Sequence, residues 1–266
     1  MWVESMARQK ERLDNLLVQR GLVETRAKAK GLIMAGEVLV DGQAIDKAGT
    51  AVSLDAAIEL KQPLPYVGRG GMKLAGALQQ FKIDVNGRVC ADVGACTGGF
   101  TDVLLQNGAA RVYAIDVGYG QLDWKLRQDK RVLVMERTNA RYVEALAEPV
   151  SFVCIDVSFI SLKLILPAVK NWLDASRETD IVALIKPQFE AGPQQVGKGG
   201  IVKDTAVHRQ VLDDILDWAG QNELASIDLM RSPVTGTDGN VEFLLWLRLG
   251  EKGEVGETAV AKALNL

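Results

Sequence analysis

Histidine, cysteine and long apolar runs are scarce in this 266-residue sequence. It has one histidine, His208, and three cysteines, and no two cysteines form a C-x-x-C pair. A zinc site and a histidine-dependent hydrolase triad are therefore poor explanations of its function, because both need more of these side chains. No stretch approaches the roughly 18 consecutive apolar residues of a membrane-spanning helix, and the N-terminus lacks the order of a secretory signal peptide. We expect a cytoplasmic protein with no metal site and no membrane partner.

Strong net charge is also missing. The chain has 31 basic and 34 acidic side chains, which give a formal net charge of −3. A polycation that binds nucleic acid through its overall charge is excluded, so any such affinity must come from a local patch. Apolar residues make up 48% and charged residues 24% of the chain, which is typical of ordinary globular proteins. At roughly 150 residues per domain, the length allows one large domain or two unequal ones.

A short segment that contains proline and glycine separates two parts with different patterns. We take this segment, residues 63–71, as a linker between a first domain at 1–62 and a second domain at 72–249. Residues 250–266 have the composition of a polar tail. Met6, which opens a basic run, is a second candidate start beside Met1.

The first domain carries the concentrated positive charge of the sequence. Its pattern predicts a helix from about Leu13, a second helix at 26–35 capped by Thr25, and a hairpin turn at Asp41-Gly42. Seven basic and three acidic residues lie between positions 8 and 30, an excess of +4. Such residues are often a solvated helix face, but a local excess on an acidic protein favours contact with phosphates. We predict phosphate contact by seven side chains: Arg8, Lys10, Arg12, Arg20, Arg26, Lys28 and Lys30.

The second domain alternates short apolar runs with amphipathic stretches. The apolar runs predict seven strands, at 88–92, 111–116, 132–136, 152–156, 181–186, 226–231 and 241–248. The amphipathic stretches predict helices at 101–106, 122–128, 161–173 and 205–221. This alternation predicts an α/β domain with a parallel sheet covered on both faces. Ligands of such sheets bind beyond the carboxyl ends of the strands.

Ionisable residues stand at the ends of four predicted strands: Asp92, Asp116, Asp156 and Lys186. One such residue usually marks where a strand reaches solvent, but four at the same edge indicate a site. Glu242 opens the apolar run 243–247, where an unpaired carboxylate would cost several kcal/mol. Lys186 is its expected partner if the two strands approach each other.

A glycine-rich turn at 92–101 lies between a predicted strand and a predicted helix. Glycine lets the backbone approach a ligand closely, and the N-terminus of the following helix can donate N–H groups. The turn does not have the G-x-G-x-x-G dinucleotide pattern. Asp116, 24 positions after Asp92, suits a carboxylate that binds the two ribose hydroxyls of an adenosine.

Several short motifs occur together: the turn at 92–101, Asp116, Asp156-Val157-Ser158-Phe159-Ile160-Ser161, Lys186-Pro187-Gln188-Phe189-Glu190 and Gly239-Asn240-Val241-Glu242-Phe243. In these motifs the sequence resembles the TlyA family, historically labelled haemolysins. That family consists of ribosomal RNA 2′-O-methyltransferases with an FtsJ-type catalytic domain. The first domain looks like the RNA-binding module first known from ribosomal protein S-four. The resemblance implies a Rossmann-like, S-adenosylmethionine-dependent methyltransferase domain behind a small α+β RNA-binding domain.

The resemblance also implies the site residues. The family's Lys-Asp-Lys-Glu pattern falls on four residues: Lys73, Asp156, Lys186 and Glu242. Without the resemblance, Lys73 would be interpreted as a surface lysine on a short helix. The family's cofactor motif falls on Asp92, Gly94, Gly98 and Asp116, with Asn139 as an adenine neighbour. A ribose 2′-hydroxyl is a weak nucleophile that must lose its proton as it attacks, so Lys186 is assigned as the base or orienting group.

The implied reaction is methylation of a ribose 2′-hydroxyl, of cytidine by the resemblance, with ribosomal RNA or ribosomal subunits as the partner. Two alternatives stay open. An RNA-binding protein that keeps the fold without catalysis would show a broken tetrad, whereas all four residues are present here. A membrane-active haemolysin, as the family's label suggests, is disfavoured by the lack of a membrane-length segment, although an amphipathic surface helix could still touch a membrane.

Overall fold

The computed structural model describes residues 9–61, 65–236, 239–250, 253 and 255–265. Contacts divide the chain into two compact units, Met1–Pro63 and Leu64–Leu266. Arg8 and the two candidate starts, Met1 and Met6, lie outside the described residues.

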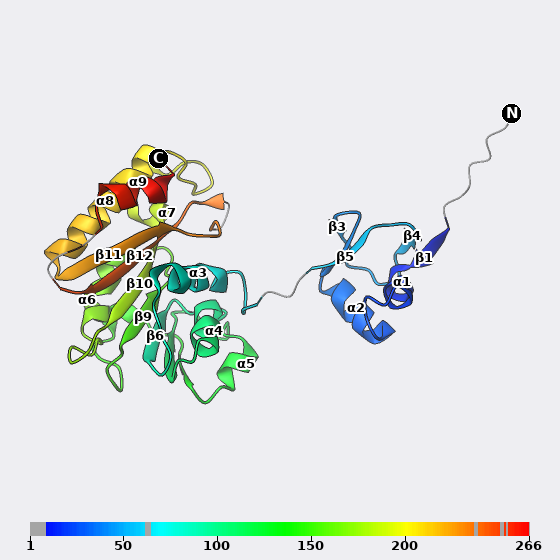
Figure 1. Ribbon diagram of the computed structural model, residues 1–266, viewed down its shortest axis with the longest axis horizontal. Helices are drawn as coiled ribbons and strands as arrows, with labels where there is room; N and C mark the ends of the chain where they lie inside the picture. Colours follow the sequence, from blue (N-terminus) through cyan, green and yellow to red (C-terminus); the bar gives the residue numbers. More distant parts are fainter. Residues whose placement is uncertain (1–8, 62–64, 237–238, 251–252, 254, 266) are drawn as a thin grey trace. The chain divides into compact units, whose positions relative to one another are not determined.

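The first unit is a small α+β fold (Figure 1). Its elements are β1 (Lys10–Arg12), α1 (Leu13–Gln19), α2 (Arg26–Met34), β2 (Val38–Val40), β3 (Gln43–Ala44), β4 (Ala51–Ser53) and β5 (Ile58–Leu60). The cap predicted at Thr25 is confirmed, because its side chain accepts a hydrogen bond from the backbone of Lys28. Asp41 and Gly42 both have positive φ, as a two-residue hairpin turn requires. Leu13, Leu17 and Ile33 form the centre of this unit's core.

The second unit is built on a seven-stranded sheet with the order β11-β12-β10-β9-β6-β7-β8. Its strands are β6 (Val89–Val93), β7 (Arg111–Ile115), β8 (Val132–Met135), β9 (Phe152–Ile155), β10 (Asp180–Ile185), β11 (Leu224–Arg231) and β12 (Phe243–Leu249). All seven predicted strands are confirmed, with small shifts at their ends. The Rossmann-like α/β class predicted for this domain is confirmed as well.

The prediction of an all-parallel sheet is wrong for β12. This strand pairs antiparallel with both β10 and β11. The connection between β11 and β12, residues 232–242, is shorter than the dozen or so residues that a parallel crossover needs, so the chain turns back directly. The start of β12 therefore lies at the carboxyl edge of the parallel strands, where Phe243 pairs with Ile185.

Helices cover both faces of the sheet (Figure 1). One face packs against α3 (Gly71–Phe81), α4 (Gly99–Gln106) and α5 (Trp124–Arg127). The other face packs against α6 (Leu162–Lys170), α8 (Thr205–Gln221) and α9 (Glu257–Leu264). Three short helical segments complete the unit: η1 (Ala140–Tyr142), α7 (Pro187–Glu190) and η2 (Pro193–Gln195). The two-sided cover predicted from the alternation is confirmed.

Two segments are more structured than the sequence suggested. In the expected polar tail, α9 buries Val260, Ala263 and Leu264 in the core beside β11. Their spacing of three and four residues places them on one helical face. In the expected linker, Tyr66 and Val67 pack on the core beneath α3. Residues 65–71 therefore belong structurally to the second unit.

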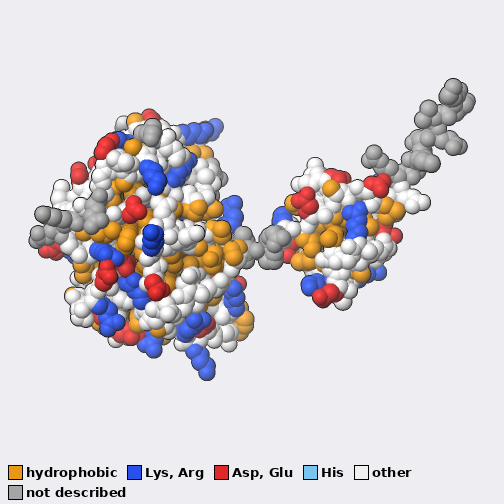
Figure 2. Space-filling model, viewed as in Figure 1, with side chains coloured by type: hydrophobic (Ala, Val, Ile, Leu, Met, Phe, Trp, Pro, Cys, Tyr) orange, Lys and Arg blue, Asp and Glu red, His pale blue; other side chains and the backbone are white. Residues whose placement is uncertain are grey.

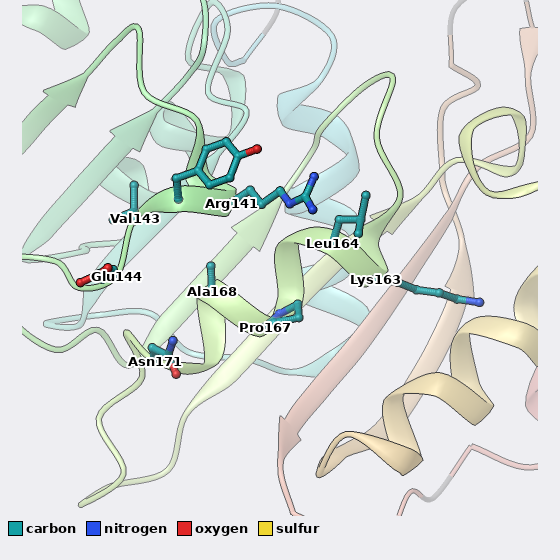
Figure 3. Close-up of a pocket in the computed structure, with 9 residues that line it drawn as sticks. Arg141, Val143, Glu144, Lys163, Leu164, Pro167, Ala168 and Asn171 are labelled. Carbon is teal, nitrogen blue, oxygen red and sulfur yellow. The ribbon is translucent and has the colours of Figure 1, made fainter.

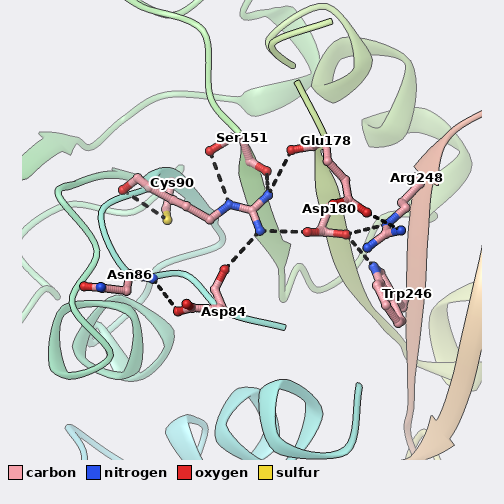
Figure 4. A network of polar contacts seen from close by, with 9 residues as sticks. Asp84, Asn86, Cys90, Ser151, Glu178, Asp180, Trp246 and Arg248 are labelled. Carbon is pink, nitrogen blue, oxygen red and sulfur yellow. Dashed lines mark hydrogen bonds and ion pairs between the residues drawn. The ribbon is translucent and has the colours of Figure 1, made fainter. Parts of the chain in front are cut away.

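A network of polar contacts closes the sheet at its amino edge (Figure 4). Asp180, at the start of β10, is buried and accepts hydrogen bonds from Arg88 Nη1 at 2.7 Å, Trp246 Nε1 at 2.8 Å and Arg248 Nε at 2.8 Å. Burial opposes ionisation of Asp180, but these three donors outweigh it and lower the pKa of its carboxyl. The network ties β10 to the start of β6 and to the end of β12.

Candidate active site

Four ionisable side chains meet at the carboxyl edge of the sheet. Lys73 comes from α3, Asp156 follows β9, Lys186 follows β10 and Glu242 precedes β12. Lys186 Nζ lies 2.6 Å from Asp156 Oδ1, and Lys73 Nζ lies 2.6 Å from Glu242 Oε2. Lys73 Nζ also lies 4.0 Å from Asp156 Oδ2. The structure thus brings together all four residues of the expected tetrad, as a chain in the order Lys186, Asp156, Lys73, Glu242.

The tetrad is largely withdrawn from solvent. Glu242 is 3% exposed, and Lys73 and Lys186 are each 9% exposed. Buried charges are tolerated when each has a hydrogen-bonded partner of opposite charge, and two lysines with two carboxylates satisfy this condition. The cluster is therefore a compact, charge-balanced group that keeps a polar opening at Asp156, whose side chain is 20% exposed.

The expected pairing of Glu242 with Lys186 is wrong. Their strands are neighbours, but Lys186 Nζ bonds to Asp156 and to Ser158 Oγ, which lies at 2.9 Å. Glu242 bonds to Lys73 instead, because α3 carries that lysine over the start of β12. The same carboxylate packs closely on Gly236, where an added Cβ would lie 2.1 Å from Glu242 Oε1.

A cavity of about 560 Å³ opens beside the tetrad. Its walls come from the ends of β6, β7, β8 and β9, and its lining includes Gly94, Cys96, Asp116, Asn139 and Asp156. This volume falls within the range of roughly 300–1,000 Å³ that is typical of small-molecule sites. The cavity lies at the carboxyl edge of the sheet, where the sequence predicts a ligand.

Asp116 is held in place by the backbone around it. Its Oδ2 accepts a hydrogen bond from Cys96 N at 2.8 Å, and its Oδ1 accepts one from Gly118 N at 2.6 Å. Each carboxylate oxygen has further acceptor capacity, so both can also receive a hydroxyl donor from the cavity. This arrangement fits the paired hydroxyls of a ribose.

The two glycines assigned to the cofactor have different surroundings. Gly94 has φ +86°, lines the cavity, and would place a Cβ 2.3 Å from the carbonyl oxygen of Asp156. Gly98 has φ +98°, and its Cβ would lie 2.2 Å from Leu126 Cδ1. Gly94 therefore allows a close approach of two strand ends at the cavity, whereas Gly98 allows α5 to pack on the start of α4.

Asp92 and Asn139 are also placed clearly. Asp92 is fully buried and lies outside the cavity lining; its Oδ2 accepts hydrogen bonds from the backbone and the hydroxyl of Thr101, at 2.8 and 2.7 Å. Among the described residues, none bonds to Asp92 Oδ1. Desolvation raises the pKa of Asp92 to about 7. Asn139 lines the cavity, and its Oδ1 accepts a hydrogen bond from Arg141 N at 3.1 Å.

Two site residues were missed by the sequence analysis. Ser158 bonds to Lys186, as described above, and lines the cavity. Phe159 is 90% exposed, has a positive φ of 64°, and its ring centroid lies 4.9 Å from that of Phe189. Both follow Asp156 within three residues, so their position just past a strand end was the signal that could have identified them.

The six predicted RNA-binding residues that the structure describes fall into two groups. Arg12 and Arg26 bond to the buried Asp14 at 3.0 and 2.9 Å, and they hold the pKa of that carboxyl well below its usual range. Arg20 donates to the carbonyl oxygens of Leu54 and Ala56. The second group is exposed and consists of Lys10, Lys28 and Lys30. The arginines thus also stabilise the fold, whereas the three lysines extend from it.

Charge on the visible face of the second unit is mixed. Figure 2 shows basic and acidic side chains interspersed there, with apolar atoms between them. The described side chains on this face therefore form no continuous field of one sign.

A second cavity lies between η1 and α6 (Figure 3). It has a volume of about 580 Å³, and its lining includes Arg141, Tyr142, Lys163, Pro167 and Asn171. No tetrad residue and no expected cofactor residue lines it.

Within the described ranges, no group of three or more histidine, cysteine, aspartate or glutamate side chains is placed to hold a metal ion. No described helix is both long and apolar enough to cross a membrane.

Comparison with known proteins gives matches to both units. Residues 66–249 match the family of FtsJ-like methyltransferases, and residues 11–58 match the S4 domain. The chain is 50% identical to YqxC of Bacillus subtilis, provisionally named an rRNA methyltransferase, over 95% of this chain and 90% of that relative. It is 49% identical to the 16S/23S rRNA (cytidine-2′-O)-methyltransferase TlyA of Mycobacterium tuberculosis, over 98% of this chain and 99% of that relative. A solved structure from Streptococcus thermophilus, provisionally labelled a hemolysin, superposes with a TM-score of 0.75 at 44% identity and covers 97% of this chain and 96% of its own.

Proposed function

This chain belongs to the TlyA family of FtsJ-like methyltransferases, and we propose that it methylates a ribose 2′-hydroxyl in ribosomal RNA with S-adenosylmethionine as the methyl donor. The observation that carries the proposal is the buried chain of Lys186, Asp156, Lys73 and Glu242 beside a cavity of nucleoside size. The Mycobacterium relative is named for cytidine, so cytidine is the nucleoside we propose.

The residues around the carboxyl-edge cavity fit the proposed donor. S-adenosylmethionine supplies, when bound, an electrophilic methyl group on a sulfonium. Asp116 would accept hydrogen bonds from the ribose hydroxyls, and Asn139 would lie beside the adenine. Gly94, with no side chain, would let the methionine end approach the backbone next to Asp156. Asp92 would act indirectly, because its hydrogen bonds to Thr101 fix the backbone of the glycine-rich turn beside the methionine end.

Lys186 is the residue we propose to receive the proton of the ribose hydroxyl. Its amine lies beside the cavity and is held by Asp156, so it is positioned before substrate arrives. Lys73 lies 4.0 Å from the other oxygen of Asp156 and is itself held by Glu242. In this arrangement Lys73 and Glu242 position Asp156, and Asp156 positions Lys186.

The first unit is proposed to bind the RNA substrate. Its exposed lysines, Lys10, Lys28 and Lys30, offer positive charge to phosphates, and the half-exposed Arg12 and Arg26 add to it. Arg8 and Arg20 complete the proposed set. The partner would be ribosomal RNA or a ribosomal subunit, which also implies a cytoplasmic location.

Transfer of a labelled methyl group from S-adenosylmethionine to unmodified ribosomal subunits tests this function. Lys186→Ala should lower the rate by about 10²–10⁴-fold, the usual contribution of a positioned general base. Lys130→Ala is the matched control, because Lys130 is exposed and precedes β8 at the opposite edge of the sheet. A Lys186→Ala protein that transfers methyl groups at the wild-type rate would contradict the assignment.

A further inference from the structure

Ser158 has a contact that the proposed tetrad does not explain. Its Oγ lies 2.9 Å from Lys186 Nζ. The same Nζ lies 2.6 Å from Asp156 Oδ1. Among the described residues, these are the two hydrogen-bond acceptors of the Lys186 amine. Lys186 is 9% exposed, so these contacts are largely shielded from competing water. Ser158 also lines the cavity proposed for the methyl donor.

An amine nitrogen is tetrahedral, so the acceptors of its hydrogens determine where its lone pair points. Apart from the bond to Cε, Nζ has three tetrahedral positions. In the charge-balanced cluster the resting Lys186 is an ammonium with a hydrogen in all three positions, and it can act as a base only after it releases one of these protons to water. In the neutral amine that remains, two positions hold hydrogens and the third holds the lone pair. Because a carboxylate and a hydroxyl oxygen both accept hydrogen bonds, Asp156 and Ser158 direct the two hydrogens toward themselves. The lone pair is then left in the third position.

We propose that Ser158 is a positioning residue that orients the Lys186 lone pair toward the ribose hydroxyl. The inference rests on the proposed function. As the 2′-oxygen forms its bond to the methyl carbon, the carbon–sulfur bond breaks with its electrons staying on sulfur. The hydroxyl proton passes to the Lys186 lone pair, and the resulting ammonium later releases it to water. Ser158 keeps its own proton throughout.

Without Ser158, one hydrogen of the neutral amine loses its acceptor. The lone pair can then occupy either of two positions. The amine gains a hydrogen bond when its unpaired hydrogen turns toward the ribose oxygen, and this orientation points the lone pair away from the substrate. The variant loses the productive orientation of the Lys186 amine but binds its substrates as before. We therefore expect kcat to fall and KM to stay unchanged. A serine that only satisfies a buried lysine would instead affect stability and leave kcat unchanged.

The test compares Ser158→Ala, Ser158→Thr and wild-type protein in methyl transfer to ribosomal subunits. Ser158→Ala should lower kcat by about tenfold, the scale of one net hydrogen bond to a charged or polar group. The KM for subunits and the calorimetric affinity for S-adenosylmethionine should stay within about twofold of wild type. Ser158→Thr, which keeps the hydroxyl, should recover most of the rate.

A double-mutant cycle checks that Ser158 acts through Lys186. In a Lys186→Ala background, Ser158→Ala should cause no further loss, because the amine that it orients is gone. Ser226→Ala is the matched control: Ser226 is a buried serine on β11 whose Oγ is without a partner in the described structure. Thermal unfolding of each variant separates a loss of fold from a loss of orientation. If Ser158→Ala does not fold, Ser158→Cys replaces it in the test. Its kcat should also fall, since sulfur is a weak hydrogen-bond acceptor.

Four results would overturn the inference: an unchanged kcat for Ser158→Ala, a loss confined to KM or to donor affinity, a further loss in the Lys186→Ala background, or a folded Ser158→Thr protein as slow as Ser158→Ala. Failure of the proposed function looks different, because wild-type protein itself would then transfer no methyl group.

Discussion

Asp116 is the residue on which the proposed donor site depends most directly. Two backbone N–H groups fix its carboxylate at the cavity, so it can receive ribose hydroxyls without reorganising. Asp116→Ala should weaken the affinity for S-adenosylmethionine by at least about tenfold, since hydrogen bonds to a charged group contribute about 1.5–3 kcal/mol. Calorimetry checks this, with Asp214→Ala on the exposed side of α8 as the control. Equal affinities for Asp116→Ala and wild type would remove the ribose from this position.

Asp92 predicts a dependence of stability on pH. Burial raises the pKa of Asp92 to about 7 in the folded protein, whereas an unfolded aspartate titrates near about 4. Between these values the folded state holds a proton that the unfolded state releases. Stability from this residue is therefore present below pH of about 4 and is lost as the pH rises toward 7.

Asp92→Asn removes this titration and keeps an oxygen acceptor for Thr101. Relative to wild type, the variant should gain at least about 1 kcal/mol in free energy of unfolding between pH 5 and pH 8. Urea unfolding at the two pH values measures the difference. A stability difference that does not change with pH would show that Asp92 is ionised in the folded protein across this range.

Single residues also show how far the sequence predicts the site. Asp116, Asp156 and Lys186 could be identified because each ends an apolar run, and parallel strands bring such ends to one edge. Lys73 could not, since nothing in a short helix shows that it will lie over a buried glutamate; only the family resemblance identified it. Ser158 lacks a pattern of its own, because its role depends on a contact with a residue 28 positions away.

At the scale of elements, periodicity predicted which segments form strands and helices but not every direction. The seven strands were evident because buried strands are nearly continuous apolar runs. The reversal of β12 is not visible in its own composition, which is the same in both directions; the short connection before it, residues 232–242, was the signal that could have predicted it. The reversal places Glu242 at the ligand edge of the sheet. The wrong strand direction and the wrong partner predicted for Glu242 therefore both involve the start of β12.

The polar network at the amino edge should matter for stability. Asp180 joins Arg88, which precedes β6, and Arg248, which lies on β12. Its removal leaves two partly buried guanidinium groups without their carboxylate. Asp180→Ala should lower the free energy of unfolding by about 2 kcal/mol, below the roughly 3–5 kcal/mol of a fully buried pair because both arginines keep some solvent contact. Chemical denaturation measures the loss. A change under about 0.5 kcal/mol would show that solvent replaces the network.

At the scale of the whole molecule, we propose that the first unit binds RNA and the second unit transfers the methyl group. Replacing Lys28 and Lys30 by glutamine removes two exposed charges without disturbing the Arg12–Asp14–Arg26 cluster. RNA affinity should fall, and the slope of log affinity against log salt should become shallower by about 1–2. Affinity for S-adenosylmethionine should stay unchanged. An unaltered salt slope would mean that these lysines do not contact phosphate.

The most direct test of the central claim is the chemical position of the transferred methyl group. Ribosomal RNA labelled by this protein from S-adenosylmethionine can be hydrolysed in alkali, which cleaves the backbone through a free 2′-hydroxyl and fails where that hydroxyl is methylated. The account predicts that the label remains in an alkali-resistant dinucleotide with cytidine at its 5′ position. Label released in a mononucleotide would place the methyl group on a base and contradict ribose 2′-O-methylation.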